Sequence, residues 1–596
     1  MLLDANPLAP GASGSPGPFR DRSNRMPDDP PPMSSEERRN RRCRLLDGGL
    51  VVTLGAAVLI EWTGGFVLEL LGREITVRSA GTALTLFVLL WLVRSGLAGG
   101  LARTARFAAL ALTWAFVGLV LVVALDRAVR AARGRVVGPE PGDAPPVASS
   151  RTGLAGSADW NVLLVSLDTL RADHLGCYGY ERATSPVIDE LAAAGVLFRQ
   201  HVASAPSTLD SHASLLTSLN PTAHGARVSP PSPLAGEAVT LAERLAGAGF
   251  TTAAFTGGGQ LDRTFGLAQG FGLYTDDHKP FEESVDEAVA WLSEREDDRW
   301  FLFLHTYQPH HPYRPHGRLS KRFSRGYQGP LPEVISVDLV RRINTGDLPI
   351  DAADLAYIVA RYDGEIAYTD RHLGRLFRFL RDNGQWDRTL VVVTSDHGEE
   401  FGEHGWVAWH SHTLYDELLW IPLVMRLPGN FAGTVVDEQT RAVDVLPTLL
   451  DALGLPRDEA MVGSSLLPRL DGRSSGTGPA AISERTLGTP LISGRTSRAK
   501  LVYPTDLLPA RGGGWLAGLS SAERHRRVAP DRALFDLRSD PGETRDVCSP
   551  RTWRGGQLRD DLSTVHQRDV EDSLAGARVD LDAELRQRLR ALGYLD

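Results

Sequence analysis

Carboxylate and imidazole side chains directly follow two apolar segments of this 596-residue chain. Asp168 closes the segment NVLLVSLD (161–168), and Asp396 and His397 follow TLVVVTS (389–395). If both segments are strands of one parallel sheet, their carboxyl ends meet at the same edge and these side chains lie close together. Such a cluster of carboxylates and imidazole binds divalent cations. The pattern therefore predicts a metal site, although a single Asp after a strand more often caps the next helix.

Further histidines and glutamates crowd around the second of these segments. Within 17 residues the sequence holds Asp396, His397, Glu399, Glu400, Glu403, His404, His410 and His412. Another stretch, HTYQPHHPY (305–313), contains His305, His310 and His311. This density is unusual in a plain loop and supports the prediction of metal-type ligands at the end of the second segment. For His310 and His311 the alternative is a pair of surface histidines in a proline-rich turn.

Segments typical of strands and of helices alternate from residue 159 onward. Apolar runs at 161–168, 251–256, 300–307 and 389–396 alternate with amphipathic stretches such as SPVIDELAAAG (185–195). The alternation predicts an α/β fold in which helices sandwich a mostly parallel sheet. We assign a catalytic domain to 159–455, and a small C-terminal α+β subdomain with a tail to 456–596.

The N-terminal part of the chain differs in composition. Residues 1–44 are rich in Pro, Ser and Gly and end in an Arg cluster, so we expect a disordered basic N-terminus. The next part, 45–126, contains apolar runs at 49–71, 81–101 and 105–125. Each run is long enough for a helix through a hydrocarbon core of ~30 Å, which predicts a membrane domain with three transmembrane helices. A linker, 127–158, follows.

Arginines near the predicted spans indicate an orientation. With the N-terminus inside, eight of them lie on the cytoplasmic side and six on the other. The excess favours this orientation. The expected location is then the cell membrane, with three passes and the catalytic domain outside the cytoplasm, and the lipid bilayer is a partner.

The charge distribution excludes one class of partner. Residues 1–135 carry 17 basic and 11 acidic residues, whereas the remainder carries 47 basic and 62 acidic residues. A largely acidic body argues against nucleic acid as a partner. The three cysteines lie far apart and form no CxxC pair, so neither a disulfide framework nor a Cys-based zinc site is indicated.

The motifs of the chain resemble, in order, those of the sulfatase family within the alkaline-phosphatase-like superfamily. SLDTLRADHLGCYGY (166–180) is similar to the first metal motif, TLDSHASLLTS (208–218) to the nucleophile motif, and VTSDHGEEFGEHG (393–405) to the second metal motif. LFDLRSDPGETRDV (534–547) resembles the C-terminal signature. The resemblance covers about 159–550 and implies the alkaline-phosphatase/sulfatase-like fold and activity on sulfate or phosphate esters.

The resemblance also implies a nucleophile. Sulfatases carry Cys or Ser in this position, and counting nine residues back from Thr217 places Thr208 there. Because Thr cannot be converted to formylglycine, we expect a hydroxyl activated by one divalent metal ion, which could be Zn, Mn, Ca or Mg. The alternative is that Thr208 only caps the following helix. The implied metal ligands are Asp168, Thr208, Asp396 and His397.

Histidines complete the implied site. The substrate-binding lysines of the family have no counterpart, because none of the three lysines lies in a motif, and Thr169 stands where a second acid is usual. We expect His412 or His310 to protonate the leaving oxygen. The expected substrate-binding residues are His212, His404 and His305.

Three functions remain open. The first is a metal-dependent hydrolase of sulfate or phosphate esters that forms a covalent intermediate on Thr208. The second is a transferase that moves a phosphoethanolamine or phosphoglycerol head group onto envelope glycans or lipids. The third is a non-catalytic binding protein on the same scaffold. The C-terminal DPGE signature favours the hydrolase, and the joint presence of all four implied metal ligands argues against the third function.

Overall fold

The chain divides into two compact units, Met1–Pro146 and Val147–Asp596. The structure is a computed structural model, and it describes residues 66–70, 73–77, 159–429, 431–470, 478–505, 532–548, 556–574 and 581–592. In the first unit, strand β1 (Phe66–Leu70) pairs antiparallel with strand β2 (Arg73–Val77). The second unit contains every predicted site residue.

The prediction of three membrane-spanning helices requires a correction. Among the described residues, no helix combines the length and the apolar character that crossing a bilayer requires. The runs 81–101 and 105–125 lie outside the described residues, and the described part of the run 49–71 is strand β1. That run contains a Gly-Gly pair and two glutamates, which disfavour a buried helix. The predicted three-pass location in the cell membrane, with the catalytic domain outside the cytoplasm, is therefore wrong.

An eight-stranded sheet forms the centre of the second unit. Its strands are β3 (Asn161–Leu167), β4 (Val196–Val202), β5 (Thr251–Phe255), β6 (Leu273–Thr275), β7 (Trp300–Thr306), β8 (Thr389–Thr394), β11 (Trp420–Arg426) and β12 (Thr434–Arg441). They lie in the order β12-β4-β11-β8-β3-β7-β5-β6. Only β11 runs antiparallel to its neighbours. The predicted α/β fold with a mostly parallel sheet is confirmed.

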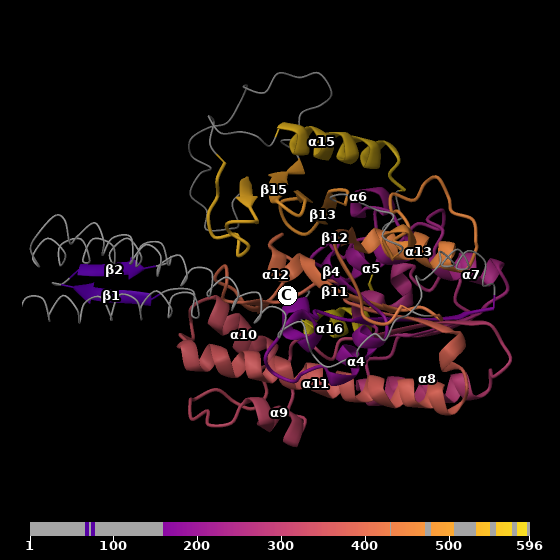
Figure 1. Ribbon diagram of the computed structural model, residues 1–596, viewed down its shortest axis with the longest axis horizontal. Helices are drawn as coiled ribbons and strands as arrows, with labels where there is room; N and C mark the ends of the chain where they lie inside the picture. The colour runs from indigo at the N-terminus through magenta and orange to yellow at the C-terminus, as the bar shows by residue number, and fades with distance from the viewer. Residues whose placement is uncertain are drawn as a thin grey trace, which may run out of the picture. The chain divides into compact units, whose positions relative to one another are not determined.

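Helices cover both faces of this sheet because its central strands are apolar on both sides. Alternate residues of β3 face opposite cores: Val162 and Leu164 point to one, Leu163 and Val165 to the other. The first core is closed by α5 (Thr208–Thr217), α7 (Leu241–Gly247), α13 (Val445–Ala452) and α16 (Ala583–Ala591). The second is closed by α4 (Pro186–Ala194), α8 (Phe281–Ser293), α10 (Val337–Asn344) and α11 (Ala352–Asp382). Figure 1 shows α8 and α11 on one side of the sheet and α5 and α13 on the other.

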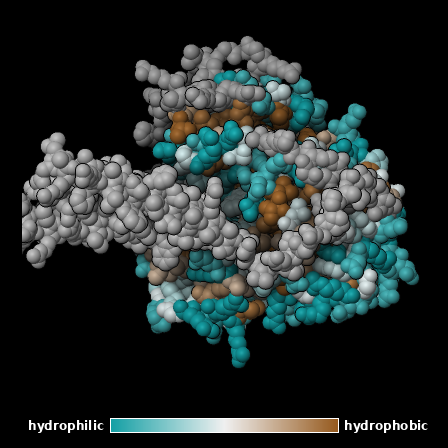
Figure 2. All heavy atoms as spheres, in the orientation of Figure 1, coloured by the Kyte–Doolittle hydropathy of each residue, from teal (hydrophilic) through white to brown (hydrophobic). Residues whose placement is uncertain are grey.

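Short elements connect these layers and flank the two histidine-rich loops, 305–313 and 396–412. They are α6 (Pro221–His224), α9 (Arg318–Phe323), α12 (Asp416–Leu419), α14 (Leu467–Leu470), β9 (Glu400–Phe401) and β10 (Val407–Trp409). Strands β9 and β10 pair antiparallel. On the face drawn in Figure 2, hydrophilic residues make up most of the described surface, as expected when apolar side chains fill the two cores.

A second, antiparallel sheet lies near the C-terminus. It consists of β13 (Ala481–Arg485), β14 (Leu491–Arg495), β15 (Ala499–Pro504) and β16 (Ala533–Asp536), and α15 (Gly556–Glu571) packs on it. The completely buried Lys500 joins this sheet to α12, because its Nζ lies 2.9 Å from Asp416 Oδ1 and 3.0 Å from Glu543 Oε1. Arg495 adds a contact of 2.8 Å to Asp416 Oδ2. These ion pairs connect the C-terminal sheet to α12, which follows the histidine-rich loop 396–412.

A buried glutamate between the C-terminal sheet and α6 leads to a pH-dependent prediction. Glu484 is 2% exposed, and its Oε2 accepts the Thr222 N–H at 3.0 Å. Burial raises the pKa of Glu484 from 4.5 to about 8. The folded chain therefore holds this proton more tightly than the unfolded chain does. The resulting stabilisation is complete below the unfolded pKa and is lost as the pH rises through the folded pKa.

We expect Glu484→Gln to change the melting temperature little at pH 5 and to raise it at pH 8.5, because the neutral amide avoids the buried charge. The gain in free energy of unfolding at pH 8.5 should be about 1–3 kcal/mol. Thermal unfolding followed by circular dichroism at both pH values measures it. The exposed Glu296→Gln is the matched control. The same temperature difference at both pH values would contradict the prediction.

Candidate active site

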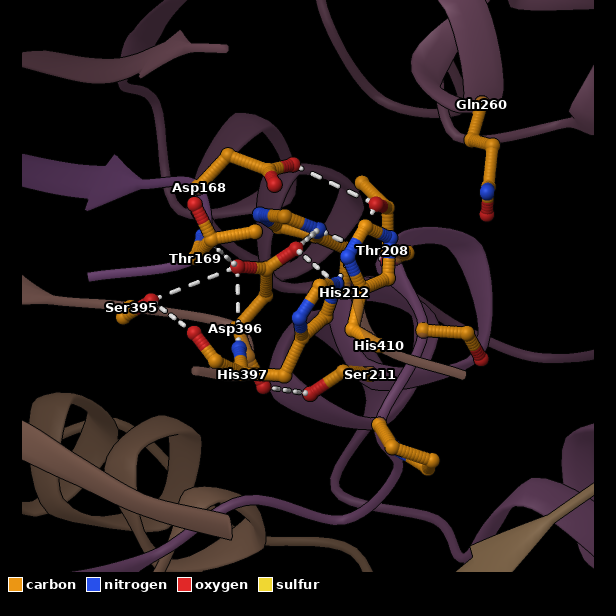
Figure 3. A network of polar contacts seen from close by, with 12 residues as sticks. Asp168, Thr169, Thr208, Ser211, His212, Gln260, Ser395, Asp396, His397 and His410 are labelled. Carbon is orange, nitrogen blue, oxygen red and sulfur yellow. Dashed lines mark hydrogen bonds and ion pairs between the residues drawn. The ribbon is translucent and has the colours of Figure 1, made fainter. Parts of the chain in front are cut away.

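Three segments that lie far apart in the sequence meet at one edge of the main sheet. Asp168 follows β3, Asp396 and His397 follow β8, and Thr208 begins α5 after β4. Strands β3 and β8 are parallel neighbours, so their carboxyl ends coincide. The four side chains belong to residues that are at most 1% exposed. Figure 3 shows them turned toward one another.

The Thr208 hydroxyl faces this acidic cluster. Its Oγ1 donates to Asp168 Oδ2 at 3.2 Å and lies 3.4 Å from His397 Nε2. Ser207 occupies the N-cap position of α5, and Thr208 is the first helical residue. The Leu209 N–H donates to Gln260 Oε1 at 2.8 Å. Thr208 therefore does not act as the cap of α5, which was the alternative role for this residue.

Two buried carboxylates face each other beside this hydroxyl. Burial and the charge of Asp396 raise the pKa of Asp168 well above its usual value. Burial also acts to raise the pKa of Asp396, but His397, His212 and His305 outweigh it and hold this pKa below the usual range. Because two buried charges of the same sign repel, two carboxyl groups whose pKa values shift in opposite directions keep one proton between them. Asp168 is the group that holds it.

The donor set of this cluster fits a divalent cation. Ligand atoms of Asp168, Asp396 and His397 lie within 4.8 Å of one another. Within the described part of the chain, Asp168 Oδ1 and Asp396 Oδ2 have no hydrogen-bond partner although they are buried. Buried polar atoms without a partner are rare in folded proteins, and a bound ion can satisfy them. Carboxylate, imidazole and hydroxyl donors suit Zn, Mn, Ca or Mg.

A strained turn holds Asp168 in place. Thr169 has a φ of 55°, a left-handed conformation that is unfavourable for a β-branched residue. Its N–H donates to Asp396 Oδ1 at 3.3 Å, and its carbonyl accepts the Tyr362 hydroxyl at 2.7 Å. The Thr169 Oγ1 is buried and has no hydrogen-bond partner among the described residues. Strain of this kind persists where the surroundings impose it, which is common at functional sites.

His212 and His305 lie behind the metal-type ligands. His212 Nδ1 contacts the Thr208 carbonyl at 2.8 Å and its Nε2 contacts Ser166 Oγ at 2.9 Å. His305 Nε2 lies 3.3 Å from Asp168 Oδ2. Both residues are completely buried, and burial lowers the pKa of each below its usual value. Through these contacts, His212 orients Thr208 and His305 orients Asp168.

His310 lies in a second cluster, with His311, His410 and Glu399. The ring centroid of His310 is 4.4 Å from that of His311 and 4.8 Å from that of His410. The His410 ring lies 4.6 Å from that of His397, which links this cluster to the first. Burial lowers the pKa of His310 and of His410 well below the usual value. The alternative of surface histidines does not hold, because His310 and His311 are 2% exposed.

His412 and His404 have different surroundings. His412 Nε2 lies 2.8 Å from Glu400 Oε2, and its side chain is 18% exposed. The His404 ring stacks on Tyr415 at 3.4 Å, and its Nε2 lies 3.2 Å from the Glu543 carbonyl. Burial acts to lower the pKa of His404, but the adjacent Glu417 outweighs it and raises this pKa. His404 thus contacts Tyr415, Glu417 and the Glu543 carbonyl rather than the Asp168 cluster.

The sequence assigned no individual role to Glu399, His311 or His410. The high density of acidic and imidazole residues between 396 and 412 was the available signal. This density does not identify which of these side chains contact His310, because the stretches 305–313 and 396–412 are about a hundred residues apart in the chain.

Comparison with known proteins assigns the domain that carries this site. Residues 160–455 match the model of the sulfatase family. This part of the chain is similar to the sulfatase family. The chain is 31% identical over 221 residues to the multifunctional alkaline phosphatase superfamily protein PehA of Trinickia caryophylli, a match that covers 32% of this chain and 42% of that relative. It is 24% identical over 387 residues to an arylsulfatase of Clostridium perfringens, covering 53% of this chain and 79% of that one.

Solved structures include proteins of similar fold. The phosphonate monoester hydrolase of Agrobacterium radiobacter has a TM-score of 0.53 at 24% identity, covering 69% of this chain and 96% of that chain. A protein in complex with its substrate D-glucosamine-2-N,6-O-disulfate has a TM-score of 0.56 at 18% identity, covering 70% and 99%. At these identities the likeness concerns the fold. It covers a larger share of the chain than the family match does.

We expect a divalent cation to stabilise the folded chain through Asp168. In chelator-treated protein, Asp168→Asn should change the melting temperature little, because the raised pKa already keeps this carboxyl protonated. At a cation concentration near 100 times its Kd, the native chain should gain about 2.7 kcal/mol in free energy of unfolding. Asp168→Asn should lose most of the gain due to this site. Thermal unfolding with and without Mn²⁺ measures it, with the exposed Asp437→Asn as control. An undiminished gain in Asp168→Asn would contradict the assignment.

Proposed function

We propose that the chain is a hydrolase of sulfate or phosphate esters in which Thr208 is the nucleophile. The observation that carries this proposal is the Thr208 Oγ1, buried 3.2 Å from Asp168 Oδ2 and 3.4 Å from His397 Nε2. The names of two similar proteins, an arylsulfatase and a phosphonate monoester hydrolase, support an ester of a sulfur or phosphorus oxyacid as the substrate.

Asp168, Thr208, Asp396 and His397 would hold one divalent cation. When bound, this ion supplies positive charge that favours the ionised hydroxyl and the anionic ester. Thr208 stands at the first position of the ten-residue helix α5. The positive end of the helix dipole therefore also favours negative charge at its Oγ1. Ser211 Oγ, which donates to the Asp396 carbonyl at 2.7 Å, keeps α5 fixed against the end of β8.

The reaction proceeds through a covalent ester on Thr208. The Thr208 hydroxyl gives its proton to Asp168 Oδ2, which accepts its hydrogen bond at 3.2 Å. The bond from Oγ1 to sulfur or phosphorus forms as the bond to the alkoxy oxygen of the substrate breaks. The leaving oxygen takes a proton from His412 or from His310. His412 is the more accessible of the two, and its Nε2 lies 2.8 Å from Glu400 Oε2. Water then cleaves the covalent ester, and the Thr208 hydroxyl recovers its proton.

Substitution at Thr208 tests the nucleophile. We expect Thr208→Ala to lower kcat/KM by about 10³-fold or more, because no oxygen is left to attack. Thr208→Ser retains the hydroxyl and should keep activity within about 100-fold of the native chain. The assay uses 4-nitrophenyl sulfate, phosphate, phosphodiester and phosphonate substrates on the full chain. Circular dichroism checks that each variant folds.

The exposed Thr345→Ala serves as the control and should retain native activity. Undiminished turnover by Thr208→Ala would refute the role of Thr208 as nucleophile. A native chain that hydrolyses no ester of the panel but transfers the head group of a labelled phospholipid would refute hydrolysis in favour of the transferase.

A further inference from the structure

Strand β13 of the C-terminal sheet lies against the segment that leads to the proposed nucleophile. Ser483 Oγ donates to the Ala203 carbonyl at 2.6 Å, and the Glu484 N–H donates to the Ser204 carbonyl at 2.9 Å. The segment bound in this way connects β4 to α5, which begins with Thr208. The approach to the nucleophile is therefore held by a strand that lies outside the part of the chain that matches the sulfatase family.

Thr486, the residue after β13, binds the first turn of α5. Its Oγ1 donates to Asp210 Oδ1 at 2.6 Å, while Ser207 Oγ donates to Asp210 Oδ2 at 2.8 Å. Asp210 is 2% exposed, so these hydrogen bonds lie inside the protein. Because Asp210 stands two positions after Thr208, the contact from Thr486 fixes the turn of the helix that presents the nucleophilic hydroxyl.

Arg485, the last residue of β13, binds the backbone of His412. Its Nη1 donates to the His412 carbonyl, and its Nε donates to the Thr489 carbonyl at 3.1 Å. Arg485 is 6% exposed, so little water competes for these hydrogen bonds. The contact with Thr489 fixes the guanidinium on its own sheet. The contact with His412 then fixes the loop that carries one of the two proposed proton donors.

The loop of His412 has a strained backbone that needs such support. Ser411 has a φ of 71°, a left-handed conformation that is uncommon for a residue other than glycine. Ser411 Oγ donates to the Pro206 carbonyl at 3.1 Å, so this loop is also bound to the segment before Thr208. His412 Nδ1 donates to the His410 carbonyl at 3.0 Å, which fixes the ring relative to the same backbone and leaves Nε2 to exchange a proton.

We propose that the end of β13 positions the nucleophile and the proton donor relative to each other. Thr486 acts on Thr208 through the first turn of α5. Arg485 acts on His412, which this inference takes as the donor in place of His310. The inference rests on the proposed function for both roles, and Arg485 and Thr486 are positioning residues that act through others. A displacement of reacting groups by about 1 Å can lower a rate by about 100-fold, so such support has a measurable effect.

The leaving group of the substrate tests the role of Arg485. A 4-nitrophenolate ion leaves readily without a proton, whereas the more basic phenolate ion needs one from a general acid. We expect Arg485→Met to lower kcat by about 100-fold for a phenyl ester, but by less than about 5-fold for the 4-nitrophenyl ester of the same acid. His412→Asn should show the same selective loss, and the double variant should lose little more than His412→Asn alone. The exposed Arg498→Met is the matched control and should keep the native kcat for both esters.

Thr486→Val tests the contact with α5. The variant removes the hydroxyl that donates to Asp210 but keeps the branched shape of the side chain. We expect kcat to fall by about 10-fold, and equally for both esters, because the change acts on the nucleophile rather than on the donor. Thr486→Ser keeps the hydroxyl and should restore the native kcat. The exposed Thr345→Val is the matched control.

Equal losses for the two esters in Arg485→Met would overturn the positioning role of Arg485 while leaving the proposed function intact. Independent, multiplying losses in the double variant would overturn it as well, because Arg485 would then not act through His412. Unchanged kcat in Thr486→Val would overturn the role of Thr486. Full turnover by Thr208→Ala together with the selective loss in Arg485→Met would count against the proposed nucleophile and support the positioning of the donor. Arg485→Lys, which keeps the charge, gives a second variant with a smaller selective loss in case Arg485→Met does not fold.

Discussion

The repulsion between two buried carboxylates, Asp168 and Asp396, is the interaction on which the rest of the site depends. Both residues are at most 1% exposed, and burial of two like charges is strongly unfavourable unless something compensates for it. Backbone N–H groups of Thr169 and His397 donate to Asp396 Oδ1, at 3.3 and 2.9 Å. One oxygen of each carboxylate still has no hydrogen-bond partner among the described residues. A dication between them is the compensation that this donor set fits best.

The elements around this pair serve to keep it in position. Parallel strands β3 and β8 bring the two carboxylates to one edge, and α5 brings Thr208 to the same place. His212 and His305 support the ligands from the buried side, through contacts to the Thr208 carbonyl and to Asp168 Oδ2. The left-handed conformation of Thr169 persists because its N–H and carbonyl are both bound. Rigid positioning of this kind is what an activated nucleophile requires.

The histidine-rich loop is held from two sides, which gives the C-terminal sheet a part in the site. On one side, the Arg171 guanidinium binds the Glu399 carbonyl at 2.9 Å and the Glu403 carboxylate at 2.6 Å. On the other, Lys500 and Arg495 bind Asp416, and His404 contacts the Glu543 carbonyl. Lys500 is one of the three lysines outside the motifs, and its sequence position alone indicates no role. In the folded chain it anchors the segment that follows His412.

The sequence alone was sufficient for the α/β fold, for the sulfatase resemblance and for the grouping of Asp168, Asp396 and His397. These features depend on local patterns: apolar runs that predict buried strands, and polar residues placed directly after them. It was not sufficient for the membrane spans, because apolar content does not distinguish a helix from the pairing of β1 with β2, and the two remaining runs lie outside the described residues.

Only the tertiary structure decided that Thr208 faces Asp168 rather than capping α5, and that His212 and His305 lie beneath the ligands. Only the fold, too, brought His310 and His311 beside His410 and Glu399. Contacts between segments a hundred residues apart depend on strand order and side-chain packing, and these leave no periodic signal in a single sequence.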